Sequence, residues 1–303
     1  MSLAVRAEHA RLPEAARADW PGTREAPRPG WAGLREAPRP GWASMREALH
    51  AEWTKLRTLA STGWLLLAAI AATVAVGATA AASVRCPAVG GCPADTTKLS
   101  LTGIEFGQAL VAILAVLAIG SEYGTGMIRI TFTAMPRRRA VLAAKAVILA
   151  GLVLAAGTLA VLGSVLAGRL ILPGNGFTAA HGYQPISLAD GPVLRAAAGS
   201  VLYLALIALL SLGVATAVRD SAVAIGVVLG LLYLFPIIAG VVTNPHWQRH
   251  LEQIGPMTAG LSIQATTGLR GLVIAPWAGL GVLAAWAAAA LLAGGLLLRL
   301  RDA

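Results

Sequence analysis

Side chains that could carry out chemistry are sparse in this sequence. Its three lysines, Lys55, Lys98 and Lys145, lack the glycine that must directly precede the lysine of a phosphate-binding loop, Gly-x-x-x-x-Gly-Lys-Ser/Thr. The chain therefore cannot use such a loop to bind and hydrolyse ATP. It also lacks the clustered His, Asp or Cys residues that a membrane-bound enzyme would need near one face. We expect no catalytic residue and no cofactor bound by this chain.

Two small groups of reactive side chains remain. His246 and His250 are four residues apart, with Glu252 nearby, a spacing that could place two metal ligands on one helix face. Since no third His or Cys stands at a suitable distance, we interpret them as an exposed polar turn. Cys86 and Cys92 flank Pro-Ala-Val-Gly-Gly. A disulfide that closes this short loop is the favoured hypothesis, ahead of free or lipidated cysteines and of a metal site.

The elements around these residues are predicted to be membrane-spanning helices. Of the 303 residues 57% are hydrophobic and 13% charged, and the mean hydropathy is +0.71. The apolar residues fall in uninterrupted blocks, and a helix needs about 20 such residues to cross the hydrocarbon core. We expect an all-α integral membrane protein with six transmembrane helices, at residues 64–84, 101–120, 140–167, 193–218, 221–242 and 276–298.

The basic residues predict the orientation of these spans. The net charge is +10, but aromatic residues are only 5% of the chain and do not alternate with the basic ones, so nucleic acid is not an expected partner. Alternate connecting segments are richer in Lys and Arg, which predicts that both termini are cytoplasmic in the cell membrane. The external segments are then 85–100, 168–192 and 243–275. Glu105, Lys145 and Arg195 lie near predicted span ends, from where they could snorkel to the interface.

The first 43 residues differ from the rest. An 11-residue unit rich in Pro, Arg and Gly begins at Trp20 and again at Trp31, with a partial copy at Trp42. Such short repeats cannot bury enough surface to fold, which predicts a disordered cytoplasmic tail. No apolar stretch typical of a secretory signal precedes Trp64. A further hypothesis is that translation starts at Met45.

Residues 44–62 are predicted to form an amphipathic helix along the membrane surface, followed by the six-span transmembrane domain 63–303. Leu49, Trp53 and Leu56 share one apolar stripe at about 100° per residue. Glu52 falls inside this stripe. A carboxylate there is costly unless it meets a cation or a partner.

The longest predicted cytoplasmic loop contains a recognisable motif. It reads Ser121-Glu-Tyr-Gly-Thr-Gly-Met-Ile-Arg-Ile-Thr-Phe-Thr-Ala-Met-Pro-Arg-Arg-Arg139, and Lys145 follows. It resembles the Glu-Tyr-x-x-Gly-Thr-Ile-Arg, Pro-x-Arg and Ala-Lys pattern of permease subunits of type-2 ABC exporters. The stretch 51–59, with Glu52, Trp53, Lys55 and Leu56, resembles the helix before the first span of these permeases. Met127 and Arg139 depart from the usual residues.

The resemblance implies a permease that couples ATP hydrolysis by a separate cytoplasmic ATPase, which binds ATP and Mg²⁺, to export of an amphiphilic or lipid-like molecule. It implies a homodimer or a heterodimer with a second permease, and short re-entrant helices between His246 and Leu272. The loop would be the coupling helix that contacts the ATPase. Its residues that match the motif are Glu122, Tyr123, Gly126, Arg129, Pro136, Arg137 and Arg138.

Several alternatives stay open. The arginines of this loop could serve topology alone, or bind lipid phosphates. Glu122 calls for another role, because acidic residues contribute little to topology, and we expect it to pair with Arg137, Arg138 or a basic residue of the partner. Gly226 and Gly230 form a Gly-x-x-x-Gly pair for packing within the bundle or for a dimer contact. The alternative function is an ion-gradient-driven secondary transporter, although no titratable group at mid-depth and no repeat of spans are visible.

Overall fold

The structure is a computed structural model that describes residues 46, 49–54, 60–86, 94–124 and 138–300. Within these residues all regular secondary structure is helical. Six helical segments are long and apolar enough to cross a membrane: Ala60–Ser83, Thr96–Gly124, Ala140–Asn175, Gly191–Val218, Ser221–Val241 and Pro276–Leu298. The predicted all-α architecture with six transmembrane helices is confirmed.

The long helices are α2 (Ala60–Ser83), α4 (Ile104–Gly124), α6 (Arg138–Ile171), α7 (Gly191–Val218), α8 (Ser221–Val241) and α11 (Pro276–Leu300). Several boundaries differ from the sequence prediction. Residues 60–62, expected in the interfacial helix, begin α2, and α6 extends beyond residue 167. Gly63 and Gly168 stand at these two places, but neither interrupts its helix.

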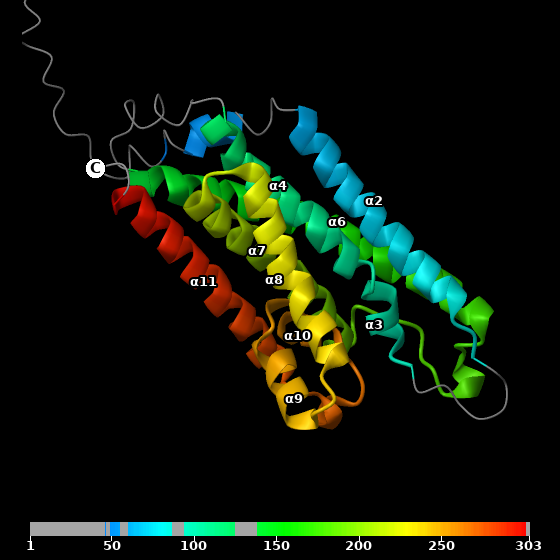
Figure 1. Cartoon of the computed structure of the whole chain (residues 1–303). Helices are drawn as coiled ribbons and strands as arrows, with labels where there is room; N and C mark the ends of the chain where they lie inside the picture. The colour runs from blue at the N-terminus through cyan, green and yellow to red at the C-terminus, as the bar shows by residue number, and fades with distance from the viewer. Residues whose placement is uncertain (1–45, 47–48, 55–59, 87–93, 125–137, 301–303) are drawn as a thin grey trace, which may run out of the picture. The chain divides into compact units, whose positions relative to one another are not determined.

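Two of the long helices form the centre of the bundle (Figure 1). In the span that contains α4 and in α7, 61% of the most apolar stretch is buried, compared with 22 or 28% in the other four. The outer helices expose large apolar side chains instead, as Leu67, Leu162, Leu234 and Leu292 illustrate. Exposed leucines on every outer helix are typical of a surface that faces lipid.

The second span is not one continuous helix. It begins at Thr96 with α3 (Thr96–Leu101) and resumes with α4 at Ile104. At the break, a Cβ on Gly103 would overlap the carbonyl oxygen of Thr73 in α2. Gly103 therefore allows the backbones of α2 and α4 to touch, the usual basis of close helix packing in membranes.

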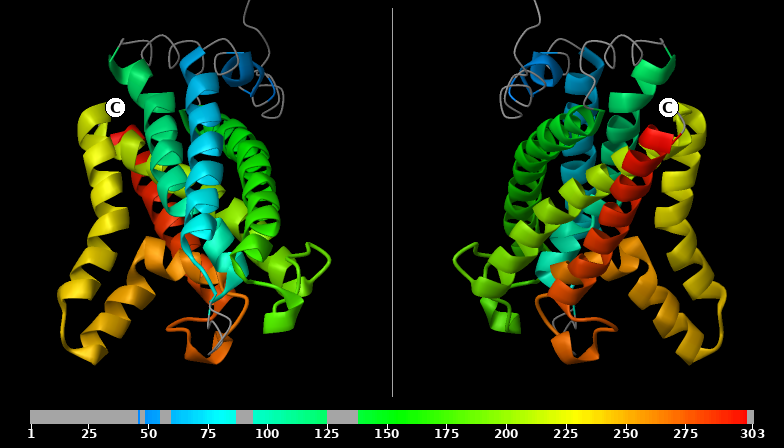
Figure 2. Two further views of the ribbon diagram at one scale, coloured as in Figure 1. Left: turned by 90° about the vertical axis from the view of Figure 1, so that its right-hand side faces the viewer. Right: turned by 90° about the vertical axis from the view of Figure 1, so that its left-hand side faces the viewer.

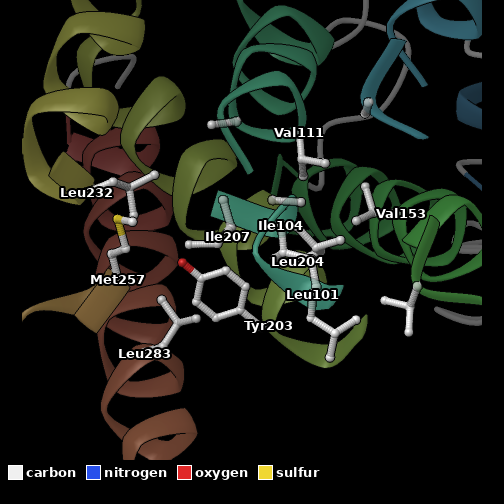
Figure 3. Packing of buried hydrophobic residues seen from close by; sticks show 14 of the residues in the cluster. Leu101, Ile104, Val111, Val153, Tyr203, Leu204, Ile207, Leu232, Met257 and Leu283 are labelled. Atoms are coloured by element: carbon white, nitrogen blue, oxygen red, sulfur yellow. The ribbon is translucent and has the colours of Figure 1, made fainter. Parts of the chain in front are cut away.

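The central helix α7 packs closely against α11 in the same way. A Cβ on Gly213 would come within 2.5 Å of the backbone of Ala290 and Leu291, and one on Gly294 within 2.7 Å of the carbonyl oxygen of Gly213. Figure 3 shows part of the buried core, where Tyr203 lies among Ile207, Met257 and Leu283. The α7–α11 pair thus joins the last span to the centre.

The segment between α8 and α11 contains short helices, α9 (Pro245–Ile254), α10 (Pro256–Leu261), η5 (Ser262–Gln264) and η6 (Leu269–Gly271). Figure 2 shows α10 turning back from the end of α9 toward α11. Ile263 and Gln264 of η5 are almost fully buried. Short helices were expected in this segment from the resemblance, and their re-entry into the membrane stays a prediction.

The two ends of the bundle differ in content. The start of α2, the end of α4, the start of α6 and the end of α11 lie at one end, here called the α4–α6 end (Figure 1). The short helices α3, α9 and α10, with η3 (Leu172–Asn175) and η4 (Ala179–His181), lie at the other, the α9–α10 end.

Candidate functional site

The α4–α6 end contains a buried lysine. Lys145 lies in the second turn of the apolar part of α6, and only 1% of its surface is exposed. The prediction that Lys145 would snorkel to the membrane interface is wrong. A buried ammonium is costly unless it is paired and hydrogen-bonded, so its neighbours decide whether this site is stable.

Lys145 is held by two carboxylates and one carbonyl. Its Nζ lies 2.6 Å from Oε2 of Glu52, 3.0 Å from Oε1 of Glu122 and 3.0 Å from the carbonyl oxygen of Ala118. An ammonium group has three N–H donors, so these acceptors match its capacity. We call Glu52, Lys145 and Glu122 the lysine cluster.

Each member of the lysine cluster comes from a different element. Glu52 lies in the helical residues 49–54, Glu122 in the last turn of α4 and Lys145 in α6. Both carboxylates are at least nine-tenths buried. The cation that the sequence required for Glu52 is therefore Lys145, and the cluster ties the interfacial segment to two spans.

The residue after Glu122 contacts a different helix. Successive helical residues point about 100° apart, so Tyr123 lies on another face of α4 than Glu122, and the guanidinium of Arg219 lies 5.8 Å from its ring centroid. Arg219 caps α7 with a left-handed φ of 66°. It also donates to the carbonyl oxygen of Leu297 in α11 at 3.4 Å. The end of α4 thus contacts α6 through Glu122 and α7 through Tyr123.

This geometry suits the transfer of movement better than catalysis. One ammonium links three elements, and two of them, α4 and α6, flank the segment 125–137 in the sequence. Because a buried ion pair is strongly destabilised when one partner moves away, the three elements are expected to move together.

The structure covers only part of the predicted loop. Glu122 and Tyr123 lie in α4, while Gly126, Arg129, Pro136 and Arg137 lie outside the described residues. Arg138 is the first residue of α6, and only its backbone is described. The structure shows Glu122 in contact with Lys145. The predicted pairing of Glu122 with Arg137 or Arg138 stays a prediction.

The interfacial helix is likewise covered in part. Trp53 is 43% exposed, and Glu52 beside it is buried. Lys55 and Leu56 lie outside the described residues, as does the predicted tail 1–43.

The glycine pair of the fifth span has no close packing partner among the described residues. In the part of the chain that the structure describes, no atom lies within 4 Å of a Cβ built on Gly226 or Gly230. Gly230 instead lines an apolar hollow with Phe235 and Trp286. The described residues therefore do not support packing within the bundle, and a dimer contact stays a prediction.

The cysteine prediction is supported at one of its two residues. Cys86 is part of a disulfide bond, and its backbone N–H donates to the carbonyl oxygen of Asn175 at 2.9 Å. Cys92 lies outside the described residues, so its pairing with Cys86 stays a prediction.

The histidines form a pair on α9, with their Nε2 atoms 3.1 Å apart. In the described ranges no group of three or more His, Cys, Asp or Glu side chains could hold a metal ion. Because two nitrogens alone make an incomplete coordination shell, we assign no metal to this pair.

The carboxylate of Asp95 connects two segments at the α9–α10 end. Asp95 caps α3 by accepting from the N–H of Lys98, and also accepts from the backbone N–H groups of Thr266 and Thr267 and from the Thr266 hydroxyl, at 2.5 to 3.0 Å. Burial raises the pKa of Asp95, but these hydrogen bonds outweigh it and the pKa is lowered. Asp95 therefore holds the segment after η5 against α3. We call the hydrogen bonds of Asp95 with Thr266 and Thr267 the Asp95 clasp.

A second polar group lies inside the bundle. The Tyr203 hydroxyl donates to the side-chain oxygen of Gln108. The Tyr233 hydroxyl donates to the carbonyl oxygen of Glu105 at 2.5 Å. These bonds join α4 to α7 and α8 and satisfy polar groups that lipid cannot.

Sequence reasoning missed the lysine cluster because it treated each ionisable residue by itself. Glu52, Glu122 and Lys145 all lie near the same predicted membrane surface, in the interfacial helix, just after the second span and near the start of the third. That coincidence of depth and opposite charge is a signal that could have paired them. The Asp95 clasp has no comparable signal, since its partners are backbone groups 171 and 172 residues away.

The chain thus has the architecture of a multi-pass membrane protein with one buried ionic cluster at the α4–α6 end. Comparison with protein families finds no family model that matches the chain, and comparison with curated proteins finds no match.

Proposed function

We propose that this chain is the membrane-spanning permease subunit of a type-2 ABC exporter, with both termini cytoplasmic in the cell membrane. It dimerises with itself or with a second permease and binds a cytoplasmic ATPase that supplies ATP and Mg²⁺. Its cargo is an amphiphilic or lipid-like molecule. The chain itself is not an enzyme.

The observation that carries this proposal is the lysine cluster. The loop that resembles a coupling helix begins at the end of α4, where Glu122 contacts Lys145 at 3.0 Å. The segment that resembles the helix before the first span contains Glu52, 2.6 Å from the same ammonium. Two motifs that are about 70 residues apart in the sequence therefore meet at one cation, as a shared role in receiving force from an ATPase requires.

The test is co-purification of the full chain from its native membrane. A partner with a phosphate-binding loop, identified by sequencing, should bind in a nucleotide-dependent manner and hydrolyse ATP. Glu122→Ala should leave this complex assembled, since Lys145 keeps Glu52 as its counterion, but should uncouple export from hydrolysis. Unchanged export by this variant would count against the role of Glu122.

The alternative is a secondary transporter driven by an ion gradient. One observation favours it: Glu105 is a carboxylate inside the second span, which begins at Thr96 and not near residue 101 as predicted. A chain that transports without an ATPase, under an ion gradient alone, would replace the leading proposal by this one.

A further inference from the structure

A cavity of about 420 Å³ opens at the α9–α10 end. Parts of α3, α4, α8, α9 and α10 line it, together with residues 272–274. Its volume lies within the usual range for small-molecule sites, about 300–1,000 Å³. The lining combines apolar side chains, among them Met257, Leu261 and Val273, with two carboxylates, Glu105 and Glu252.

The two carboxylates form no ion pair among the described residues. Neither Glu105 nor Glu252 has a described Lys, Arg or His nitrogen within 4.0 Å, and the Glu252 carboxylate accepts from the amide of Gln248 at 3.4 Å. Lys98 also lines the cavity, but its side chain is exposed. Both glutamates are half-buried. A partly desolvated carboxylate favours an added positive charge.

We infer that this cavity binds an organic cation with an apolar body, the positive charge near Glu105 and Glu252 and the body against Met257, Leu261 and Val273. A bare metal ion fits less well, because no group of three or more acidic, His or Cys side chains forms a site in the described ranges. An anion would meet two carboxylates and a single exposed ammonium. The lining therefore selects for charge as well as for shape.

The Asp95 clasp fixes the part of the cavity wall that contains Ala265. Ala265 lines the cavity and directly precedes Thr266 and Thr267, the clasp partners. The carbonyl oxygen of Ala265 also accepts from Arg195 at 2.6 Å. These contacts preorganise the wall, which lowers the cost of ordering it around a ligand.

This inference deepens the proposed function, since it names the class of cargo, and its test does not require the ATPase. The full chain in lipid nanodiscs is titrated with radiolabelled tetraphenylphosphonium, with empty nanodiscs as the blank for partition into lipid. Tetraphenylborate has the same shape and apolar surface with the opposite charge, and serves as the competitor control. We expect saturable binding of the cation that the anion does not displace.

Three substitutions locate the site. Glu105→Gln should weaken binding about tenfold, because it removes a nearby opposite charge in a medium of low dielectric constant, and Glu252→Gln should weaken it less. Asp190→Asn makes the same charge change on an exposed residue outside the cavity and should leave binding unchanged. Lys98→Gln should strengthen binding, because it removes the one cation of the lining.

The outcomes separate the claims. Equal binding of both probes, no saturable binding, or equal affinity of the wild type, Glu105→Gln and Glu252→Gln would overturn this inference. The melting temperature of each variant is recorded to check that it folds. If Glu105→Gln does not fold, Glu252→Gln on the short helix α9 tests the site instead. If the cation binds but no ATPase partner is found, the cation site stands and the proposed exporter function is refuted. If an ATPase partner is found but the cation does not bind, the exporter function stands and the cation site is refuted.

Discussion

Replacing Lys145 should destabilise the protein far more than replacing either of its counterions. Lys145→Met keeps the length of the side chain but removes the ammonium that contacts both Glu52 and Glu122. Breaking a buried ion pair by removing one partner costs about 3–5 kcal/mol, and here one change removes a cation that two carboxylates share. Because both are at least nine-tenths buried, little solvent screening reduces this cost. We expect a loss of about 3–5 kcal/mol.

Glu122→Gln is the matched control. It leaves one ammonium beside one carboxylate, so the remaining pair is neutral, and Gln retains an oxygen that can accept from Lys145. We expect a change in unfolding free energy within about 1 kcal/mol. The assay is reversible unfolding by steric trapping in bicelles, since thermal unfolding of such proteins is often irreversible. Equal stability of the two variants, or a loss of under 1 kcal/mol for Lys145→Met, would refute the assignment of Lys145 as the shared cation.

Two further predictions concern other contacts. Since the pKa of Asp95 is lowered on folding, its clasp stabilises the protein above the unfolded value near 3.8 and is lost as the pH falls through the folded value. Hydrogen exchange of residues 265–272, corrected for intrinsic rates, should rise in acid in the wild type, and Asp95→Asn should show high exchange at every pH. Gly103→Val should cost about 1–3 kcal/mol, because its Cβ overlaps α2. Gly151→Val, with no described atom within 4 Å, should be nearly neutral in the same unfolding assay.

The spans could be predicted because their signal is local. Uninterrupted apolar blocks are visible along the chain, and five of the six predicted blocks begin within four residues of the helical segments observed. The exception is the second, where α3 adds polar residues such as Thr96 and Lys98 before the apolar run. A hydropathy pattern does not include such a turn, which is held by the Asp95 cap and by the close contact at Gly103.

The partners of the ionisable residues could not be predicted with the same success. The sequence identified Glu52 and Glu122 as residues in need of a partner, but placed Lys145 at the interface, since its distance from the start of the span allowed snorkelling. Whether a side chain near a span end turns outward or inward depends on which helices are its neighbours. That arrangement follows from contacts such as Gly213 with Ala290, which the sequence pattern does not specify.

The two ends of the bundle contain different candidate sites. The lysine cluster joins three elements at the α4–α6 end. The cavity with Glu105 and Glu252 lies at the α9–α10 end. Since α4 contains both Glu122 and Glu105, it is the element through which movement at one end would alter a ligand site at the other.

Site-specific photo-crosslinking in living cells tests most directly whether force enters through the segment between α4 and α6. A benzophenone side chain is placed at Arg129, at Gly124, where no described atom lies within 4 Å of an added Cβ, and at the exposed Trp277 near the other end as the control. We predict that the first two positions capture a protein with a phosphate-binding loop and that Trp277 does not. Capture of no nucleotide-hydrolysing protein from Arg129 and Gly124 would contradict the account.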